Sequence, residues 1–494
     1  MGNISFNVRA VYDAEGKEWM FSASDIAGVL ADPKNPRKYW HDIKKRLEWG
    51  QLSAKIGQLK LPAADGKLYR TDVLNREGAE LLARRIKGSP DTESFIGWLA
   101  QFDGKNRKYV LKHKNKDVLE IELDEYGKIS MLGRTLNGEH LPVGTAKKGD
   151  ADLAAVREWW ENRSIPAIRD GLNDLLTGLK ALYLHQLICK SFGLSLSDQY
   201  WIRRQDRDLK WEDVNFFHNS FSDDAGDLLF GKTEIGDPRA VSLLSPDLTT
   251  DGVLKKRWMI IGGRRCLIKG GTLPNNQEVA NEVLASRICG RLGIPFVNYG
   301  IIELDGARYC VCDDFITGDT ELVAAWHIKK LIKKDNNTSD YDSFIAKAEE
   351  LGVKDARRRI DMMMVLDFII ANTDRHYNNF GLVRDADTLE WISVAPVYDS
   401  GTSMWCKELP SEMDAKGPKL GSKPFRTKHS DQIKLVKDLS WLDLNALDGI
   451  ENEYAEILSG SVPDPSGLEA RNRTLCIQLR RRIELLRKMT EDRG

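Results

Sequence analysis

The chain has 494 residues, 41% hydrophobic and 30% charged, and its 73 Lys and Arg nearly balance its 74 Asp and Glu. This composition is typical of a globular protein with two or three domains, and it excludes a disordered or collagen-like chain. The formal net charge of -1 excludes a strongly basic protein, so any contact with nucleic acid needs a local patch. No apolar run reaches the roughly 18 residues that cross a bilayer, and we expect no membrane contact.

Seven cysteines are scattered along the chain, and no Cys-x-x-Cys pair indicates a zinc site. Free thiols are typical of a reducing compartment. Residues 1–10 lack the charged and apolar segments of a secretory signal. We therefore expect a cytoplasmic protein.

Residues 1–104 predict a small α+β unit. The basic segment 38–47 has apolar residues at helical spacing and predicts an amphipathic helix. The Asp-Gly-Lys sequence at 65–67 predicts a hairpin turn between two short strands. Two further helices are expected at 75–86 and 92–102.

The basic segment is also the candidate for a nucleic-acid contact. Lysine and arginine side chains along one helix can pair with the phosphates of duplex DNA. A solvated amphipathic helix is the competing interpretation, because charged runs usually face water. The candidate DNA-binding residues are Lys38, Lys44, Lys45 and Arg46.

Alternating apolar and polar residues predict strands in the next part of the chain. Segments 108–111 and 118–123 fit one small antiparallel sheet. Helices are expected at 152–160 and 166–184, on either side of a break that contains Pro166.

Two hairpins and a helix are predicted beyond residue 235. Gly262-Gly263 separates strands at 257–261 and 265–269, and Asp305-Gly306 separates a second pair. Between the hairpins a helix is expected over residues 277–292. The remaining predictions are helices at 321–334, 341–351, 354–372 and 471–489, with strands at 380–383 and 390–393.

The strongest chemical signal is a polar loop that follows an apolar helix. The loop carries Asp374, His376 and Asn379 within six residues, and Asp399 comes after a later hairpin. Phosphoryl transfer uses one Asp to orient or deprotonate the acceptor, while an Asn and a second Asp hold Mg²⁺ on the phosphates. A polar loop that only caps the helix is the competing interpretation.

Two residues upstream favour the chemical interpretation. Lys269 ends an apolar strand, where its charge could neutralise phosphates, and Glu282 lies on the next helix, where it could fix that lysine. Kinase residues are recognised as an ordered set along the chain. The complete set therefore predicts phosphoryl transfer more strongly than the loop alone.

The run from Asp374 to Asn379, followed by Asp399, resembles the catalytic and metal-binding loops of the HipA-like protein kinases. Its Asp-Arg-His-x-x-Asn pattern is also similar to that of phosphoinositide kinases. Residues 109–144 resemble the small N-terminal sheet of HipA-like proteins. The resemblance covers about residues 105–490 and includes three segments typical of one Gram-positive-type subfamily: 163–166, 191–198 and 227–231.

This resemblance implies ATP and Mg²⁺ as cofactors and gives single residues a role. Asp374 would be the catalytic base, and Asn379 and Asp399 would be the Mg²⁺ ligands. Lys269 would be the ATP lysine, and His376 would contact a phosphate or another part of the active site.

The same resemblance assigns the phosphate loop to residues 248–257, although no GxGxxG or Walker A pattern is present. HipA-like kinases can also phosphorylate a hydroxyl of this loop on themselves. The residues expected to contact ATP are Thr249, Thr250, Gly252 and Lys256, and the candidate autophosphorylation sites are Ser245, Thr249 and Thr250.

The adenine contact is predicted from position along the chain. Asp313 and Phe315 follow a strand at the place where the hinge to adenine is expected, and Tyr398 is a further candidate contact. A core phenylalanine with solvated aspartate neighbours is an equally good interpretation, because such alternation is common.

Residues 1–104 resemble a second family. Four short segments are similar to the Bro-N domain of phage antirepressors and DinD-like proteins: 21–26, 39–40, 63–67 and 95–99. This likeness implies contact with duplex DNA.

Together the resemblances predict an α+β, multidomain chain. A Bro-N-like domain (1–104) precedes a HipA-like N-terminal sheet and kinase N-lobe (105–315), and a largely helical C-lobe (316–494) completes a bilobal kinase fold. The expected function is that of a Mg·ATP-dependent serine/threonine kinase, as a toxin–antitoxin or phage-related regulator. The implied partners are an antitoxin and a protein substrate such as an aminoacyl-tRNA synthetase or another translation component.

Two alternatives remain open on the sequence. One is a DNA-binding phage regulator whose kinase body is a scaffold or pseudokinase. The other is a lipid or small-molecule kinase, which the Asp-Arg-His run suggests. The presence of Lys269 with both metal-ligand candidates speaks against the first, and the HipA-like flanking segments speak against the second.

Overall fold

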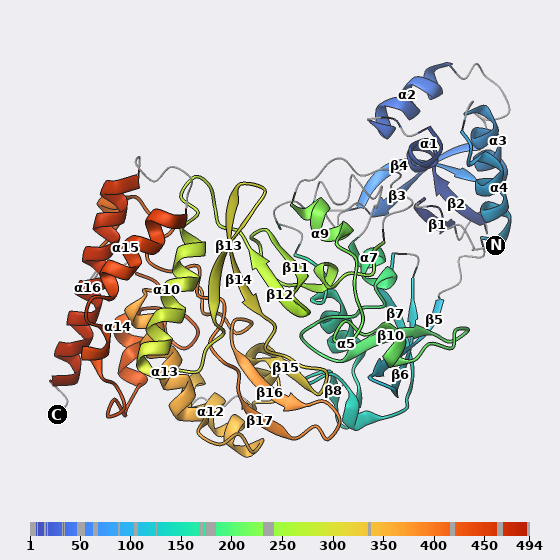
Figure 1. The fold of residues 1–494 in the computed structure, drawn as a ribbon. Helices are drawn as coiled ribbons and strands as arrows, with labels where there is room; N and C mark the ends of the chain where they lie inside the picture. The colour runs from blue at the N-terminus through green and yellow to red at the C-terminus, as the bar shows by residue number, and fades with distance from the viewer. Residues whose placement is uncertain are drawn as a thin grey trace.

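The computed structural model is a mixed α/β protein, and its described residues form five β-sheets (Figure 1). No helix of the described residues is long and apolar enough to cross a membrane. The described residues are 6, 8–13, 16, 18–31, 33, 35–46, 55–62, 68–86, 89–102, 107–124, 126–166, 169, 172, 184–230, 242–333, 337–414, 420–461 and 468–491.

The N-terminal part forms an antiparallel sheet of order β1-β2-β4-β3 and stands apart from the rest of the chain in Figure 1. Phe21, Ile26 and Leu74 are fully buried in a hydrophobic core of its own, beside a buried ion pair of Arg9 with Asp25 at 2.6 Å. The elements are β1 (Ala10–Asp13), β2 (Glu18–Ser22), α1 (Ala23–Ala31), α2 (Pro36–Arg46), β3 (Ile56–Pro62), β4 (Leu68–Asn75), α3 (Arg76–Arg85) and α4 (Thr92–Gln101).

The three helices predicted in this part are confirmed as α2, α3 and α4. The turn predicted at 65–67 and the side chain of Arg46 lie outside the described residues. The Bro-N likeness and the domain boundary at residue 104 stay predictions.

A second antiparallel sheet has the order β10-β5-β6-β7, and α5 covers it with the buried rings of Trp159 and Trp160. The strands predicted at 108–111 and 118–123 are confirmed, whereas β7 and β10 were not predicted. The helix predicted at 166–184 falls mainly outside the described residues. The elements are β5 (Arg107–His113), β6 (Lys116–Leu123), β7 (Ile129–Thr135), β8 (Ala146–Lys147), β9 (Asp150–Ala151), α5 (Leu153–Glu161), α7 (Leu184–Lys190) and β10 (Tyr200–Arg204).

The central sheet has the order β11-β12-β14-β13, and α10 packs on it through Val279 and Val283. Both predicted hairpins are confirmed. Gly263 and Gly306 have φ values of 81° and 75°, a left-handed conformation that glycine adopts without strain. The elements are α8 (Trp211–Val214), α9 (Asp224–Leu229), β11 (Lys256–Ile261), β12 (Arg264–Lys269), α10 (Gln277–Leu292), β13 (Tyr299–Leu304) and β14 (Ala307–Asp313).

The C-terminal part contains the most extensive hydrophobic core, in which α13 is buried over most of its length. Helices α10, α13, α15 and α16 lie together on the left of Figure 1. The elements are β15 (Thr320–Ala324), α11 (Ala325–Lys329), α12 (Asp340–Glu350), α13 (Ala356–Ile369), β16 (Gly381–Asp385), β17 (Trp391–Val394), α14 (His429–Gln432), α15 (Ile450–Ser461) and α16 (Glu469–Glu491).

The helix predicted at 321–334 is wrong in its first part. Residues Thr320–Ala324 form β15, which pairs with β16 in the register Leu322↔Val383. Glu321 and Val323 point inward while their neighbours are half-buried, which is the period of a strand. The partner strand lies about sixty residues away, so tertiary pairing overrides the local preference.

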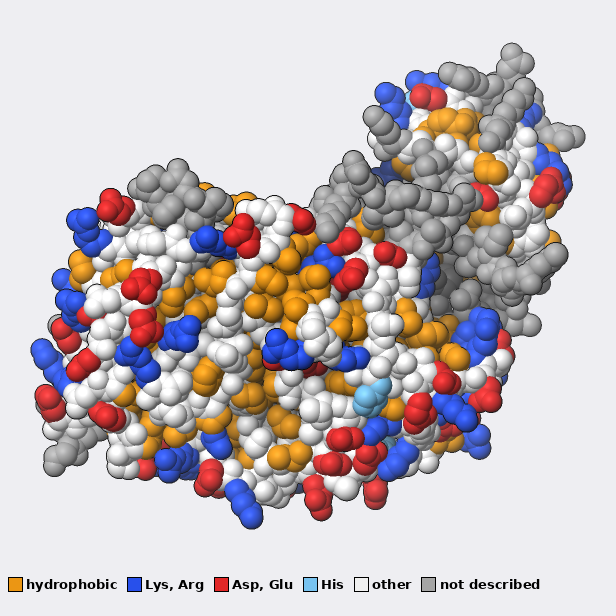
Figure 2. Space-filling view, viewed as in Figure 1, with side chains coloured by type: hydrophobic (Ala, Val, Ile, Leu, Met, Phe, Trp, Pro, Cys, Tyr) orange, Lys and Arg blue, Asp and Glu red, His pale blue; other side chains and the backbone are white. Residues whose placement is uncertain are grey.

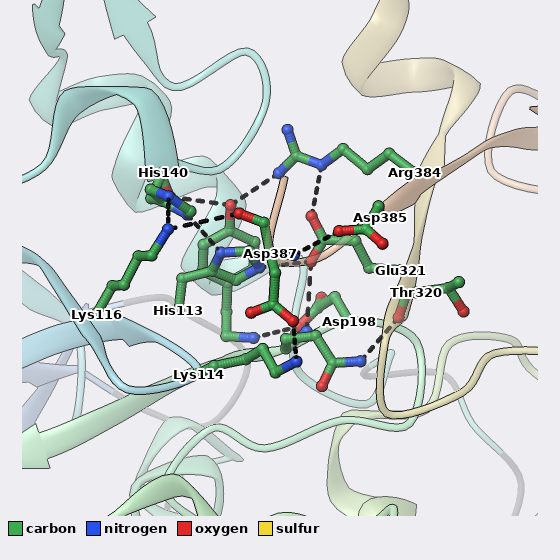
Figure 3. A network of polar contacts seen from close by, with 12 residues as sticks. His113, Lys114, Lys116, His140, Asp198, Thr320, Glu321, Arg384, Asp385 and Asp387 are labelled. Atoms are coloured by element: carbon green, nitrogen blue, oxygen red, sulfur yellow. Dashed lines mark hydrogen bonds and ion pairs between the residues drawn. The ribbon is translucent and has the colours of Figure 1, made fainter. Parts of the chain in front are cut away.

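A chain of polar contacts, buried except at Lys116, joins the second sheet to β15 and β16 (Figure 3). Lys116 Nζ lies 2.8 Å from His140 Nε2, and His140 Nδ1 lies 2.8 Å from His113 Nδ1. His113 Nε2 lies 2.9 Å from Glu321 Oε2, whose other oxygen accepts from Arg384 at 2.5 Å. The ammonium of Lys116 only donates and the carboxylate of Glu321 only accepts. Each imidazole therefore accepts a hydrogen bond on the side of Lys116 and donates one on the side of Glu321, so both imidazoles are neutral.

We expect acid to weaken this junction. Burial, with His113 and Lys116 close by, lowers the pKa of His140 to about 4. Burial alone would raise the pKa of Glu321, but His113 and Arg384 lower it to about 2. An unfolded histidine binds its proton near pH 6.5 and an unfolded glutamate near pH 4.3. Stability is therefore lost as the pH falls from about 6.5 toward 4, and further toward 2.

The free energy of unfolding in urea at pH 7.5 and 5.0 measures this effect. His140→Gln removes one titrating group, so the variant should lose less stability between the two pH values than the wild type. Comparison of the two proteins also cancels the contributions of other histidines. An equal loss in both would contradict the role of His140.

Candidate active site

A cavity of about 2110 Å³ brings together most of the residues predicted to form the site. On the face seen in Figure 2, apolar side chains gather over the central sheet, with charged side chains mainly around them. Ser245 and the candidate DNA-binding lysines lie elsewhere. The predicted residues that line the cavity are Thr249, Thr250, Gly252, Lys256, Lys269, Glu282, Asp313, Phe315, Asp374, His376, Asn379, Tyr398 and Asp399.

Lys269 is buried at the end of β12 and connects the walls of this cavity. Its Nζ lies 2.7 Å from Glu282 Oε1 on α10 and 2.8 Å from Asp399 Oδ1. Tyr299 Oη is a third neighbour at 3.2 Å. Burial alone would lower the pKa of Lys269, but Asp399 and Glu282 raise it well above its usual range. The amine therefore stays charged, as a phosphate-binding lysine must.

Asp399 lies in a strained backbone conformation with a φ of 55°. Non-glycine residues in this region are uncommon and concentrate at functional sites. Burial alone would raise the pKa of Asp399, but Lys269 and Lys256 hold it well below its usual range. The carboxylate is thus kept ionised, which is the form that binds Mg²⁺.

Glu282 ties α10 to the segment that carries Asp399. One carboxylate oxygen accepts from Lys269, and the other accepts from the Ser400 backbone amide at 2.8 Å. A shift of α10 would therefore move both the lysine and the segment with Asp399.

Arg375 fixes the polar loop and was given no role from the sequence. Its guanidinium is fully buried and pairs with Asp367 of α13 at 3.0 Å. It also donates to the Asn379 carbonyl at 3.0 Å, to Ser400 Oγ at 2.8 Å and to the Tyr398 carbonyl. The signal in the sequence was Asp367, since a carboxylate inside an apolar helix needs a cationic partner.

Asp374 lies at the edge of the cavity with about a third of its side chain exposed. Its Oδ1 accepts from Lys423 at 2.8 Å, and His376 Nε2 lies 3.9 Å from its Oδ2. The side-chain Nδ2 of Asn379 donates to the Asp374 carbonyl at 2.9 Å, which leaves its Oδ1 as the atom that could bind a cation. Asp374 and Asn379 thus come from one turn and face the same cavity.

A buried 3₁₀ turn, Pro246–Thr249, leads into the phosphate-loop candidate, residues 248–257. Asp247 accepts from the Trp258 amide at 2.7 Å and from Ser245 Oγ at 2.9 Å. Burial raises the pKa of Asp247 to about 6, because these bonds only partly compensate. The turn is therefore anchored to β11.

The three candidate autophosphorylation hydroxyls are engaged within this loop. Ser245 is fully buried and donates to Asp247, and Thr249 donates to the Leu194 carbonyl at 2.6 Å. Thr250 donates to the Pro246 carbonyl at 2.7 Å. In this conformation none of them is presented as a phosphoryl acceptor, so the prediction requires the loop to leave its place.

Gly252 and Lys256 lie against one another in the same loop. Gly252 has a φ of 103°, and a Cβ there would collide with Lys256 Nζ. The positive φ favours glycine, whereas the lysine amine is the end of a flexible side chain and could move aside. Burial lowers the pKa of Lys256 to about 8, with Lys269 adding to the effect, while Asp399 opposes it.

The predicted adenine contact is an aromatic pair. The rings of Phe315 and Tyr398 stack with centroids 5.6 Å apart. Asp313 is exposed and pairs with Arg264 at 2.7 Å. Asp314 is half-buried, its Oδ1 accepts from the Ile316 amide at 3.0 Å, and burial raises its pKa to about 8.

Two of the segments typical of the subfamily, 191–198 and 227–231, contact residues of the phosphate-loop candidate. In the first, the Leu194 carbonyl accepts from Thr249, and Asp198 holds this segment through a bidentate ion pair with Arg163, at 2.6 Å from each oxygen. Arg257, on β11, pairs with Asp227. Gly231 lies outside the described residues.

The donor set suits Mg²⁺ held jointly with phosphates. Among the described residues, no group of three or more His, Cys, Asp or Glu could hold a metal ion. Mg²⁺ is usually held by one or two carboxylates together with phosphate oxygens and water. Asn379 and Asp399 provide such a partial set, and the amines of Lys256 and Lys269 match the charge of phosphates.

Residues 249–455 match the family model of the HipA-like C-terminal domain. This HipA-like segment contains the residues from Lys269 to Asp399 described above. The predicted resemblance is confirmed for this part of the chain. The roles of single residues in the segment stay predictions.

Relatives of the HipA-like segment are distant. The serine/threonine-protein kinase CtkA of Helicobacter pylori is 23% identical over 194 residues, which cover 36% of this chain and 59% of that kinase. The solved H. pylori proinflammatory kinase CtkA has 19% identity and a TM-score of 0.36, covering 46% of this chain and 89% of its own. Shewanella oneidensis HipA, solved with HipB and operator DNA, has 12% identity and a TM-score of 0.46, covering 76% and 96%.

Proposed function

We propose that the chain is a Mg·ATP-dependent serine/threonine protein kinase of HipA type. The observation that carries the proposal is the position of Lys269, which is buried between Glu282 and Asp399 on the wall of a cavity that Asp374 and Asn379 also line. In kinases the same types of residue hold the ATP phosphates, hold Mg²⁺ and receive the acceptor proton.

In this proposal ATP and Mg²⁺ supply the phosphoryl group and the charge neutralisation. Lys269 and Lys256 bind phosphate oxygens, and Asn379 and Asp399 hold the cation. Phe315 and Tyr398 pack against adenine. Asp374 receives the proton of the acceptor hydroxyl.

The ionised state of Asp399 favours a kinase over a scaffold. The Asp399 carboxylate, with 34% of its side chain exposed, is held ionised by the amines of Lys269 and Lys256, and a purely structural body does not need this cluster of charges on a cavity wall. Arg375 further fixes the loop and the segment with Asp399 in one geometry. A scaffold could instead fill this space with apolar side chains.

Incubation with γ-labelled ATP and Mg²⁺, alone and with host lysate, tests the proposal. The chain should transfer label to a protein hydroxyl, and mass spectrometry should identify the acceptor, with a translation component such as an aminoacyl-tRNA synthetase as the expected class. Label on a lipid or a small molecule would favour the alternative of a lipid or small-molecule kinase. Label on Ser245, Thr249 or Thr250 would indicate that the phosphate loop opens.

Residues 1–104 are a separate part of the proposal, as a module that binds duplex DNA or an antitoxin. On α2, Lys38 and Lys45 are exposed, whereas Lys44 pairs with Asp72 at 2.8 Å and is partly neutralised. Shewanella HipA has partners of both kinds, since it was solved in a complex with HipB and operator DNA.

We expect the chain to bind duplex DNA in a salt-dependent manner. Each neutralised phosphate releases counterions, so Lys38→Ala with Lys45→Ala should reduce the slope of log K against log salt by about two. Fluorescence anisotropy with labelled duplex measures this slope, and Lys60→Ala on β3 is the control. Absence of binding at low salt would favour a protein-binding module.

A further inference from the structure

The candidate base Asp374 has a cationic neighbour from a distant part of the chain. Lys423 Nζ lies 2.8 Å from Asp374 Oδ1, forty-nine residues along the sequence. We propose that Lys423 is a positioning residue for phosphoryl transfer, which holds one oxygen of Asp374 so that the other receives the acceptor proton. This inference rests on the proposed function.

The carboxylate of Asp374 has one hydrogen-bond partner among the described residues, and that partner is Lys423. The backbone of Asp374 is fixed on both sides, because its amide donates to Asn372 Oδ1 and its carbonyl accepts from Asn379, each at 2.9 Å. His376 Nε2, at 3.9 Å, is beyond hydrogen-bond distance. Lys423 therefore determines how the carboxylate is turned.

The loop that carries Lys423 is held firmly. Gln432 Nε2 donates to the Lys423 carbonyl at 2.6 Å. Its Oε1 accepts from the amides of Phe425 and Arg426 at 3.1 and 3.2 Å. One side chain thus fixes three backbone positions, so the lysine extends from a defined backbone.

The same loop packs on the catalytic loop. The buried ring of Phe425 contacts Tyr377 and Phe380, with centroid distances of 6.0 and 6.1 Å. Both partners lie in the run that starts at Asp374. The contact therefore joins the two loops close to Lys423 and Asp374.

The ion pair contributes little to folding, which separates its role from a structural one. The side chains of Lys423 and Asp374 are 49% and 37% exposed. Exposed ion pairs of this kind add little to the stability of a fold. A shift of about 1 Å in a reacting group, in contrast, can cost about 10²-fold in rate.

The proposed step is a single displacement. The acceptor hydroxyl oxygen forms a bond to the γ-phosphorus, and the bond from that phosphorus to the β,γ-bridging oxygen breaks. The hydroxyl proton goes to Asp374 Oδ2, and ADP leaves with the bridging electron pair. Lys423 stays on Oδ1 throughout and turns Oδ2 toward the acceptor.

Lys423→Met and Lys423→Arg test this role, with Lys428→Met as the control. Lys428 lies on the same loop and its side chain is exposed. The measurements are kcat and KM for Mg·ATP, with casein as acceptor, and the melting temperature. Lys423→Met should lower kcat by about 10- to 100-fold, with KM for ATP within about two-fold and melting unchanged. Lys423→Arg should recover most of kcat, and Lys428→Met should equal the wild type.

A double variant separates action through Asp374 from an independent effect. If Lys423 acts through Asp374, adding Lys423→Met to Asp374→Asn should slow the enzyme no further. Equal kcat for wild type and Lys423→Met, or an undiminished loss in the double variant, would overturn the role of Lys423 alone. A folded wild-type chain that labels no acceptor would overturn the proposed function, and this role with it.

Discussion

Asp399→Ala should abolish phosphoryl transfer while the chain stays folded. The variant removes a metal-ligand candidate and one of the two anionic partners of Lys269, so the phosphates lose their cation. Loss of one preorganised charge costs about 10²–10³-fold in rate, and loss of a metal ligand should cost at least this much. Transfer from γ-labelled ATP measures the effect.

The fold should survive because Lys269 keeps its bond to Glu282 at 2.7 Å. Asp399→Asn serves as a second variant that keeps the shape of the side chain. Asp431→Ala is the matched control, since that carboxylate is half-exposed and Lys434, at 3.4 Å, is its one ion-pair partner among the described residues. Undiminished transfer by both Asp399 variants would refute the assignment of Asp399.

Asp374→Asn should lower turnover by about 10²–10⁴-fold with almost no change in the affinity for ATP. A general base contributes this much, and it acts on the acceptor and not on the nucleotide. The amide of the variant can still contact its neighbours, so the melting temperature should be unchanged. Equilibrium binding of ATP and single-turnover transfer, measured on the same preparation, give both quantities.

The opposite pattern would exchange the roles in the site. If Asp374→Asn weakens ATP binding while the bound complex reacts at the normal rate, Asp374 is a metal ligand. ATP binding and the transfer rate of His376→Gln serve as the comparison on the same loop, because His376 lies near Asp374 without a hydrogen bond to it.

The sequence predicted those contacts whose residues lie close together along the chain, and those site residues that follow one another in the order typical of kinases. The pair of Lys269 and Glu282 could be inferred, because an apolar strand, a turn and a helix bring strand end and helix face together. The hairpins at Gly262-Gly263 and Asp305-Gly306 could be inferred from turn chemistry, and both are present.

Contacts that depend on distant segments could not be predicted. Arg375 pairs with Asp367, and Lys423 reaches Asp374 from a loop beyond the last sheet. Neither residue stands in a recognisable motif by itself. The strand at Thr320–Ala324 was missed for the same reason, since β16 determines its conformation.

The phosphate loop shows a further limit of the sequence. Thr249, Thr250 and Lys256 line the cavity as expected, but Ser245 does not. The inward hydrogen bonds of the three hydroxyls go to the buried Asp247, the Leu194 carbonyl and the Pro246 carbonyl. Such bonds depend on burial, which the residue types alone do not reveal.

The measurement that tests the central claim most directly is a Mg²⁺ titration of ATP binding and of γ-phosphate transfer by the wild-type chain. We predict that binding strengthens with Mg²⁺, that transfer to a protein hydroxyl rises with it to saturation, and that EDTA abolishes transfer. A folded chain that binds no ATP at saturating Mg²⁺, or that binds ATP and labels no protein with host lysate present, would contradict the account.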